Sequence, residues 1–287
     1  MLQVARLAPT SLGEARDLVP TFLRRCLNAD GGFQDRGGAS DLYYTVFGLE
    51  GLIAFREDPP ESTRGYLERF GSGDSLDLVH LCCLARAWAS VLPGGAPPET
   101  AAGILARLAT FRARDGGYLL SDDSDESTVY AAFLAIGAMQ DLQADIVDRD
   151  GLLRSVAACR AADGGYANQR DADLGMTPTT AGAVAIMRHL GVEPDRSVGA
   201  WLLARAHADG GFVVAPGIPL PDLLSTATAL HALAALHVPV DALREPCLDY
   251  LDTLWTNAGG FYGSWADDIL DCEYTYYGLL ALGHLSL

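Results

Sequence analysis

Side chains able to bind a metal ion lie in one stretch near the start of the chain, residues 30–83. Asp41 and His80 are of the types that ligate Zn²⁺, and catalytic zinc takes three protein ligands and keeps one position open. The other donors here are Tyr43, a poor zinc ligand, and the thiols of Cys82 and Cys83. Asp41 equally suits a helix N-cap, and His80 suits a hydrogen-bonded core position. We therefore expect less than stoichiometric zinc, with Asp41 and His80 as its ligands where it binds.

Acidic side chains near the end of the chain form a second candidate site. Asp271 and Glu273 follow Asp267 and Asp268, and a long apolar stretch comes after them. Two residues apart, Asp271 and Glu273 do not share a helix face, but at a helix start both can reach the same open end. We expect Glu273, Asp271 and Asp41 to take part in acid–base catalysis, and Asp271 to cap its helix.

Aromatic residues accompany both groups. Those expected to bind substrate follow Asp41 and Asp271, and they are Tyr43, Tyr44, Phe47, Tyr274, Tyr276 and Tyr277. Aromatic walls accommodate apolar chains, and the negative faces of the rings stabilise cations. Ordinary core packing is the alternative. The same part of the repeat pattern also carries Trp255, Phe261, Tyr262 and Trp265.

The elements that must position these residues repeat along the chain. A glycine pair followed by an aromatic residue begins at residues 31, 116, 164, 210 and 259, and Gly71-Ser72-Gly73 is a degraded copy. Paired glycines reach the positive φ of a tight turn. A period of 40 to 49 residues with two helical patterns in each unit indicates stacked helical hairpins. We predict six hairpins, turning at about residues 31, 71, 116, 164, 210 and 259, in one domain covering residues 1–287.

The second helix of each unit is apolar on nearly every face and is therefore expected to be buried. These helices are predicted at residues 41–55, 77–91, 125–142, 177–190, 222–236 and 271–285. The first helices carry Arg and Glu and should face water. Since neither end of the array has a polar capping repeat, we predict an all-α, closed (α/α)₆ toroid, with the sixth hairpin beside the first. Strands have little support, because Pro216, Pro219 and Pro221 favour a loop.

Composition excludes several function classes. Lys and Arg total 20 against 37 Asp and Glu, a net charge of −17, which argues against nucleic acid or an anionic membrane as the main partner. The chain has no lysine, which excludes a lysine nucleophile or Schiff base. The six cysteines lack a disulfide-scaffold spacing. No apolar run suits a signal peptide or a membrane span, so we predict a cytoplasmic location.

The turn Asp30-Gly31-Gly32-Phe33, followed by an Ala-, Leu- and Thr-rich helix, resembles the repeat shared by protein prenyltransferase β subunits and squalene- or terpene-type cyclases. The resemblance covers nearly the whole chain and implies an α/α toroid. In the first unit, Arg36 falls on a diphosphate-binding arginine, Asp41 on a zinc-ligating aspartate and Tyr44 on a tyrosine of the prenyltransferases. Tyr43 falls where the zinc cysteine should be, which puts the metal in doubt.

The neighbouring units extend this resemblance. His80 matches the histidine ligand in the final repeat of the prenyltransferase subunits, and the unit containing Tyr274 to Tyr277 resembles the repeat before the zinc unit, with Asp271 in place of a histidine. In this correspondence the three consecutive repeats of the prenyltransferases match units six, one and two, so the order is circularly permuted. It therefore requires unit six to lie beside unit one in a closed ring.

An acidic run at residues 122–128 resembles the DxDD motif of class II terpene cyclases, in which a carboxylic acid protonates an alkene. Such an acid must keep its proton, so its pKa has to be raised by burial and by nearby carboxylates. Aligned on the helix that follows, Asp125 takes the first motif position, and Ser127 and Thr128 take the catalytic ones. We interpret the run as a solvated loop with Asp125 as a helix N-cap.

The resemblance implies an isoprenoid enzyme that transfers or cyclises a prenyl group in a central apolar cavity, with Arg36 and Tyr44 near a prenyl diphosphate. It also implies, as partners, an isoprenoid ligand and either a helical α-type subunit or an acceptor protein. One alternative is a non-catalytic toroid that binds a lipid or a protein, and another is an enzyme like the class II terpene cyclases. A third is an (α/α)₆ carbohydrate enzyme with paired carboxylates.

Overall fold

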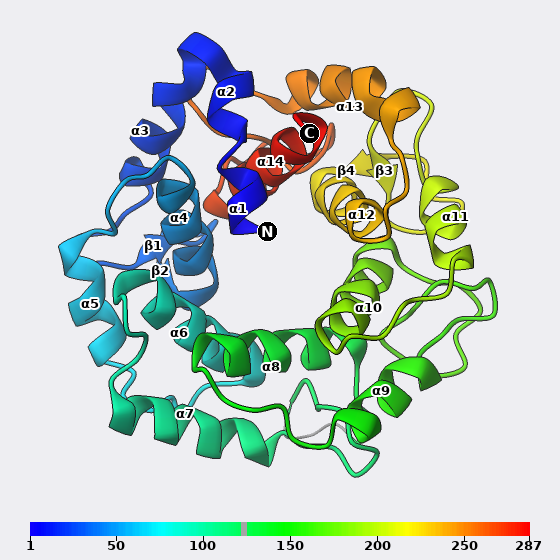
Figure 1. Cartoon of the computed structure of the whole chain (residues 1–287). Helices are drawn as coiled ribbons and strands as arrows, with labels where there is room; N and C mark the ends of the chain where they lie inside the picture. The colour runs from blue at the N-terminus through cyan, green and yellow to red at the C-terminus, as the bar shows by residue number, and fades with distance from the viewer. Residues whose placement is uncertain (122–124) are drawn as a thin grey trace.

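A computed structural model describes residues 1–121 and 125–287, and its helices form two concentric rings (Figure 1). The inner ring contains α4 (Leu42–Ala54), α6 (Leu78–Val91), α8 (Val129–Asp141), α10 (Thr177–His189), α12 (Leu223–Ala235) and α14 (Cys272–Leu285). The outer ring contains α3 (Leu18–Arg25), α5 (Glu61–Glu68), α7 (Pro98–Thr110), α9 (Arg149–Ala158), α11 (Ser197–Leu203) and α13 (Asp241–Leu254). Two short helices and a 3-10 turn precede α3 in the described chain, namely α1 (Leu2–Ala5), α2 (Ala8–Leu12) and η1 (Gly13–Asp17).

The ring is closed. Each inner helix packs against the next one along the chain, and α14 packs against α4, so the last hairpin lies beside the first. Apolar side chains of the inner helices are buried almost throughout, including Leu49 on α4 and Leu279 on α14. The predicted all-α toroid with buried second helices is therefore confirmed.

The glycine turns explain how one hairpin docks on the next. Gly31 has φ +94°, and a Cβ atom there would collide with the backbone oxygen of Ser62 in α5. Gly259 has φ +93°, and its Cβ would collide with the backbone oxygen of Leu18 in α3. Each of these turns thus lies directly on the outer helix of the following unit, and the last turn lies on the first unit. Glycine is required here both for its φ and for this close approach.

Side-chain caps set the starts of most inner helices. Asp41, Asp77, Asp222 and Asp271 accept hydrogen bonds from the free backbone N–H groups of α4, α6, α12 and α14, as predicted for Asp41 and Asp271. The prediction that Asp125 caps its helix is wrong. Thr128 caps α8 instead and accepts from the N–H of Ala131, because the apolar run that can be buried begins only at Val129.

The expectation that strands have little support is wrong in part, because two short antiparallel strand pairs are present in the described chain. β1 (Phe33–Gln34) pairs with β2 (Ser40–Asp41), and β3 (Phe212–Val213) pairs with β4 (Pro221–Asp222). Each ladder turns the chain back after a glycine pair and ends at the capping aspartate of the next helix. Pro221 is tolerated in β4 because proline has no backbone N–H and this short edge strand does not need one there.

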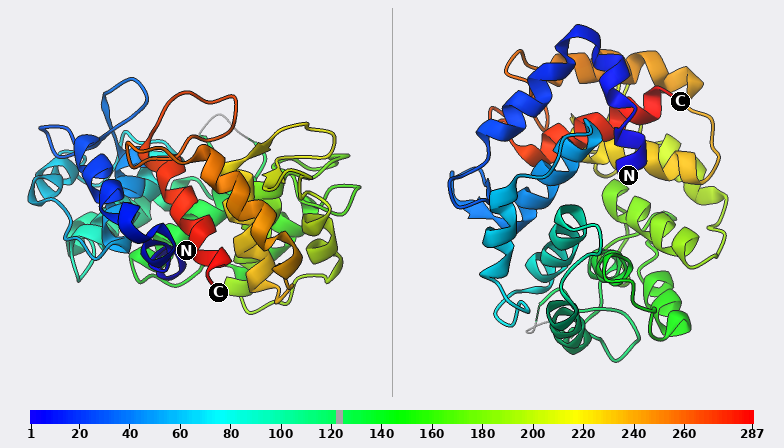
Figure 2. Two further views of the ribbon diagram at one scale, coloured as in Figure 1. Left: turned by 90° about the horizontal axis from the view of Figure 1, so that it is seen from above. Right: turned by 60° about the vertical axis from the view of Figure 1, so that its left-hand side comes forward.

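The ring has two different faces (Figure 2, left). The loops between outer and inner helices, with their glycine turns, lie on one side, which we call the loop face. Both termini lie on the opposite side, the terminal face, where α1 packs against α14 and α4. Within the described residues, no helix is both long and apolar enough to cross a bilayer.

Candidate active site

Asp41 and His80 come together on the loop face. The Oδ1 atom of Asp41 accepts from the backbone N–H groups of Tyr43 (2.8 Å) and Tyr44 (3.1 Å) and so caps α4. Its Oδ2 atom lies 3.1 Å from Nε2 of His80, whose Nδ1 lies 2.9 Å from Oδ1 of Asp77. The sequence therefore paired the correct two side chains, which come from neighbouring inner helices.

This donor set does not fit a catalytic zinc ion. His80 faces a carboxylate on each ring nitrogen, and the hydrogen bond to Asp41 is the main cause that raises its pKa to about 9. At neutral pH both ring nitrogens then carry protons, whereas a metal ligand needs a free lone pair. Burial raises the pKa of the Cys82 and Cys83 thiols. Across residues 1–121 and 125–287, no three His, Cys, Asp or Glu side chains are grouped to hold a metal.

Arg36 joins the first unit to the sixth. Its Nε donates to Oδ2 of Asp271 at 2.7 Å, and its Nη2 and Nη1 donate to the two carboxylate oxygens of Asp267 at 2.7 and 3.2 Å. The guanidinium also lies 5.2 Å from the centre of the Tyr274 ring. The side chain expected to bind diphosphate therefore already holds two carboxylates, one of them in a bidentate pair. Tyr44 lies beside Arg36, and burial raises its pKa to about 12.

Glu273 and Tyr43 form a hydrogen bond across the same seam. The Tyr43 hydroxyl donates to Oε1 of Glu273 at 2.6 Å, which links α4 to α14. Burial is the main cause that raises the pKa of Glu273 to about 7, and the negative charge of Asp271 adds to it. A substantial fraction of Glu273 is therefore protonated at neutral pH, which is the condition for a general acid.

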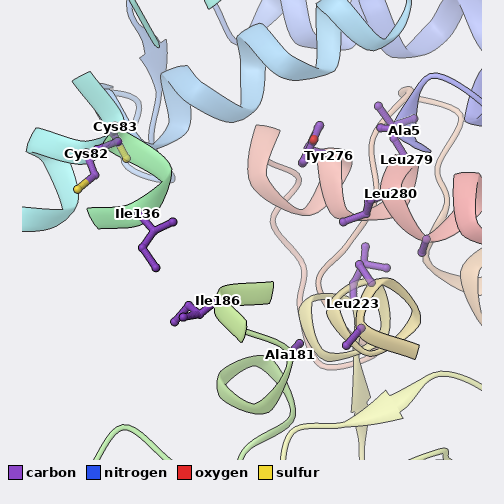
Figure 3. Close-up of a cluster of buried hydrophobic side chains, with 14 of the residues drawn as sticks. Ala5, Cys82, Cys83, Ile136, Ala181, Ile186, Leu223, Tyr276, Leu279 and Leu280 are labelled. Carbon is purple, nitrogen blue, oxygen red and sulfur yellow. The ribbon is translucent and has the colours of Figure 1, made fainter. Parts of the chain in front are cut away.

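Aromatic rings from α4 and α14 surround this pair. The Phe47 ring lies 4.9 Å from Tyr43, 5.4 Å from Tyr277 and 5.8 Å from Tyr276, measured between centroids. Tyr43, Phe47 and Tyr277 keep partial exposure, whereas Tyr276 is only 1% exposed and belongs to the core (Figure 3). Tyr130 on α8 was not predicted, yet the charge of Glu273 contributes to raising its pKa, after burial and Cys83. Tyr130 therefore approaches Glu273 from another inner helix.

Other predicted aromatics lie elsewhere. Trp255 packs on Phe261 at 5.0 Å between centroids, and Trp265 packs on Tyr250 of α13 at 5.3 Å. These rings support the sixth glycine turn and the outer helix, so they do not extend the aromatic group around Glu273.

The acidic run contributes little to the site. Ser127 donates to Oδ2 of Asp115 at 2.6 Å, Thr128 caps α8, and Asp125 is exposed. Asp122 and Asp123 lie outside the described residues. Ser127 and Thr128, at the positions that matched the catalytic acids, have structural hydrogen bonds of their own.

The profile of the prenyltransferase alpha-alpha toroid domain family matches residues 11–83, 78–213 and 183–286. The chain belongs to this family. No curated protein sequence matches it significantly.

Solved structures share this toroid fold at low identity. A variant of the type II terpene cyclase MstE from Scytonema, in complex with geranylgeranyl dihydroxybenzoate, superimposes with a TM-score of 0.67 at 15% identity over 97% of each chain. The Candida albicans protein geranylgeranyltransferase-I complexed with GGPP gives 0.60 at 17% identity, covering 94% of this chain and 90% of that one. A glycosidase variant gives 0.59 at 15% identity over 99% and 96%. At these identities the likeness concerns the fold alone.

This toroid also carries polar groups that sequence reasoning missed. Arg86 on α6 donates to Oε1 of Glu50 on α4 at 2.8 Å and to Oδ2 of Asp141, the last residue of α8, at 2.6 Å. His231 on α12 and His284 on α14 are hydrogen-bonded, with Nδ1 and Nε2 2.9 Å apart. Helical spacing was the available signal, because Glu50 follows Tyr43 by seven residues and His284 follows Tyr277 by seven, which places each pair on one helix face.

Proposed function

We propose that this toroid is an isoprenoid enzyme that cyclises a prenyl chain, and that Glu273 starts the reaction as a general acid. The observation that carries the proposal is a partly buried carboxyl group that accepts the Tyr43 hydrogen bond, with its pKa raised to about 7, beside partly exposed aromatic rings. The fold is shared with a terpene cyclase whose structure holds a geranylgeranyl compound. That ligand belongs to the other protein and supports the substrate class by analogy only.

The Tyr43–Glu273 bond assigns the acidic proton. Because the Tyr43 hydroxyl donates to Oε1, the carboxyl proton resides on Oε2. An alkene takes this proton with its π electrons, a C–H bond forms, and the neighbouring carbon becomes cationic. The remaining carboxylate keeps the Tyr43 hydrogen bond, which strengthens when its acceptor becomes charged. Tyr43 is therefore a positioning residue that lowers the barrier to proton loss.

The aromatic group would stabilise the cation. Phe47 and Tyr277 approach each other within 5.4 Å and are partly exposed beside Glu273. The ring quadrupole attracts a desolvated cation by about 2 kcal/mol. The cation is then attacked by the next alkene of the chain.

Prenyl transfer is the second candidate, and the proximity of Arg36 to Tyr44 favours it. In that case a prenyl diphosphate must replace Asp267 on the guanidinium, a bidentate contact that Arg makes with phosphates as well as with carboxylates. Calorimetry that compares the affinities for geranylgeranyl diphosphate and geranylgeraniol shows whether the diphosphate group contributes to binding. Equal affinity for both, unchanged in Arg36→Ala, leaves a lipid-binding toroid.

The decisive assay for cyclisation incubates the purified protein with geranylgeranyl diphosphate, squalene and geranylgeranyl dihydroxybenzoate in D₂O. Products should carry one deuterium at the protonated carbon. Glu273→Gln should reduce product formation by about 10²–10⁴-fold. Glu61→Gln, which changes an exposed first-turn glutamate of α5, is the matched control. Equal product from wild type and Glu273→Gln would falsify the role of this acid.

Further parts of the proposal concern the whole chain. We propose that residues 1–287 fold as one domain, since the glycine turn of the last unit rests on α3 of the first. We also propose a cytoplasmic location and no requirement for zinc. An α-type subunit or an acceptor protein belongs to the transfer alternative, and a pull-down with a prenylatable C-terminal cysteine peptide tests it.

A further inference from the structure

His231 and His284 form an unusual pair at the terminal face. Their bonded nitrogens are 2.9 Å apart, so one imidazole donates and the other accepts. His284 is 7% exposed, and in the described chain its second nitrogen, Nδ1, has no hydrogen-bond partner. A buried polar atom without a partner requires an explanation, and a functional role is a common one.

His284 lies on the same face of α14 as Glu273. Residues 273 and 284 of this helix differ by about three full turns, so their side chains project from the same face, about 16 Å apart along the axis. Tyr277 lies on that face between them. His231, on the neighbouring helix α12, keeps partial exposure. The histidines therefore lie at the opposite end of the helix face that begins with the proposed acid.

The N-terminal segment packs on this end of α14. α1 packs against α14, and a Cβ atom at Gly283 would collide with the backbone oxygen of Val4. Figure 3 shows Ala5 beside Leu279 of α14, and both are fully buried. The Ser11 and Ser286 hydroxyls, 2.7 Å apart, join the segment to the end of the helix. The family match begins only at residue 11, so α1 lies outside the matched region.

The surroundings keep both imidazoles neutral. Burial is the main cause that lowers the pKa of His231 to about 3 and that of His284 to about 4. The charge of the Met1 amino group contributes to both shifts. A neutral imidazole has a free lone pair and can accept a proton, and the carbocation is a strong enough acid to give one up even to a weak base.

We infer that the His231–His284 pair accepts the proton that ends the cyclisation and so sets the product as an alkene. This inference rests on the proposed function. The C–H bond next to the final cationic carbon breaks, its electron pair forms the new double bond, and the proton moves to an imidazole nitrogen. Solvent later takes that proton and restores the proton of Glu273, so no oxidant or further reactant is needed.

The products of His231→Gln and His284→Gln test the inference with the same three substrates. Substrate consumption should stay within about twofold of wild type, because protonation by Glu273 sets the rate. The wild-type alkene should fall at least about tenfold within the product mixture, replaced by alkene isomers and alcohols, since a positioned base contributes about 10²–10⁴-fold. His189→Gln, at the exposed last position of inner helix α10, should leave the mixture unchanged.

The outcomes separate the inference from the proposed function. Normal consumption with an unchanged mixture in both histidine variants overturns the inference alone. Conversion of none of the three substrates by wild type overturns both. Independently of any substrate, ¹⁵N NMR of the histidine side chains at pH 7 should show both imidazoles neutral. An imidazolium at either residue overturns the inference, because it has no lone pair to accept a proton.

Discussion

The two ends of α14 carry ionisable groups whose pKa values burial moves in opposite directions. At the loop face burial raises the pKa of Glu273, and at the terminal face it lowers the pKa of His284. The cause is the same, because an apolar surrounding disfavours the charged form of either group. The consequence differs, since the Glu273 carboxyl group keeps its proton whereas the His284 imidazole stays neutral and can accept one. Groups whose environments separate their pKa values in this way are candidates for acid and base roles.

Charges that do persist inside the ring are paired. Arg36 holds Asp267 and Asp271 at the loop face, while Arg86 holds Glu50 and Asp141 between three inner helices. Each arginine connects hairpins that are neighbours in the ring. Asp271 and Glu50 are similarly buried, at 3% and 5% exposure, but Asp267 lies on a loop whereas Glu50 and Asp141 both lie on helices. The second cluster therefore has fewer ways to relax when its arginine is lost.

The largest expected effect comes from Arg86→Met. The substitution leaves the carboxylates of Glu50 and Asp141 without their positively charged partner. Removing one member of a buried ion pair costs about 3–5 kcal/mol of folding free energy. Arg36→Met should cost less, about 1–3 kcal/mol, because buried Asp271 loses its charged partner but keeps the N–H of Tyr274 as a donor. Urea unfolding followed by circular dichroism measures both variants. Equal losses would remove the distinction between the two clusters.

The pH dependence of activity tests the acid end directly. Cyclisation needs protonated Glu273, so the rate should be constant well below pH 7 and fall about tenfold per pH unit above it, reaching about 100-fold at pH 9. Initial rates between pH 5 and 9 provide the measurement. The residual rate of Glu273→Gln should be flat over this range. A wild-type rate that rises with pH would contradict an acid and point to a base.

Tyr43→Phe should sharpen the same profile. The Tyr43 hydrogen bond favours the carboxylate of Glu273, so its loss raises the pKa of that carboxyl further and moves the fall in rate to higher pH. The rate at pH 6 should drop by roughly fivefold, corresponding to the loss of one hydrogen bond of about 1 kcal/mol. Tyr44→Phe is the control, since Tyr44 does not bond Glu273. A shift of the profile to lower pH would exclude the assigned donor.

The smallest effect concerns His80 and stability. Its pKa is raised from 6.5 to about 9, so the stabilisation is complete below pH 6.5 and is lost as pH rises through about 9. The raised pKa of Glu273 changes the stability at lower pH, between about pH 4.5 and pH 7, and therefore acts mainly below the pH range of the His80 effect. Melting temperatures should therefore decline from pH 7 to 9 more in wild type than in His80→Gln. Parallel curves for the two proteins would show that the carboxylates do not hold the imidazolium.

Local features of the sequence determined the hairpins. The glycine pairs predict turns because only glycine combines the positive φ with contact between backbones, as at Gly31 and Gly259. Asp41 and Asp271 predict helix starts because a cap involves residues two or three positions away. The same reasoning failed at Asp125, where several adjacent acids and hydroxyls could cap and only the burial of Val129 selects Thr128.

Only the tertiary structure decided which side chains meet. The Tyr43–Glu273 bond and the Arg36–Asp271 pair join residues more than 200 positions apart, across a seam that exists only when the ring closes. Repetition predicted that closure, and Asp41 and His80 could be paired in advance because their units are adjacent. It could not predict that Arg36 is already satisfied by Asp267, nor that His231 and His284 share a hydrogen bond. Those outcomes depend on distances between helices packed side by side, which no local pattern in the chain encodes.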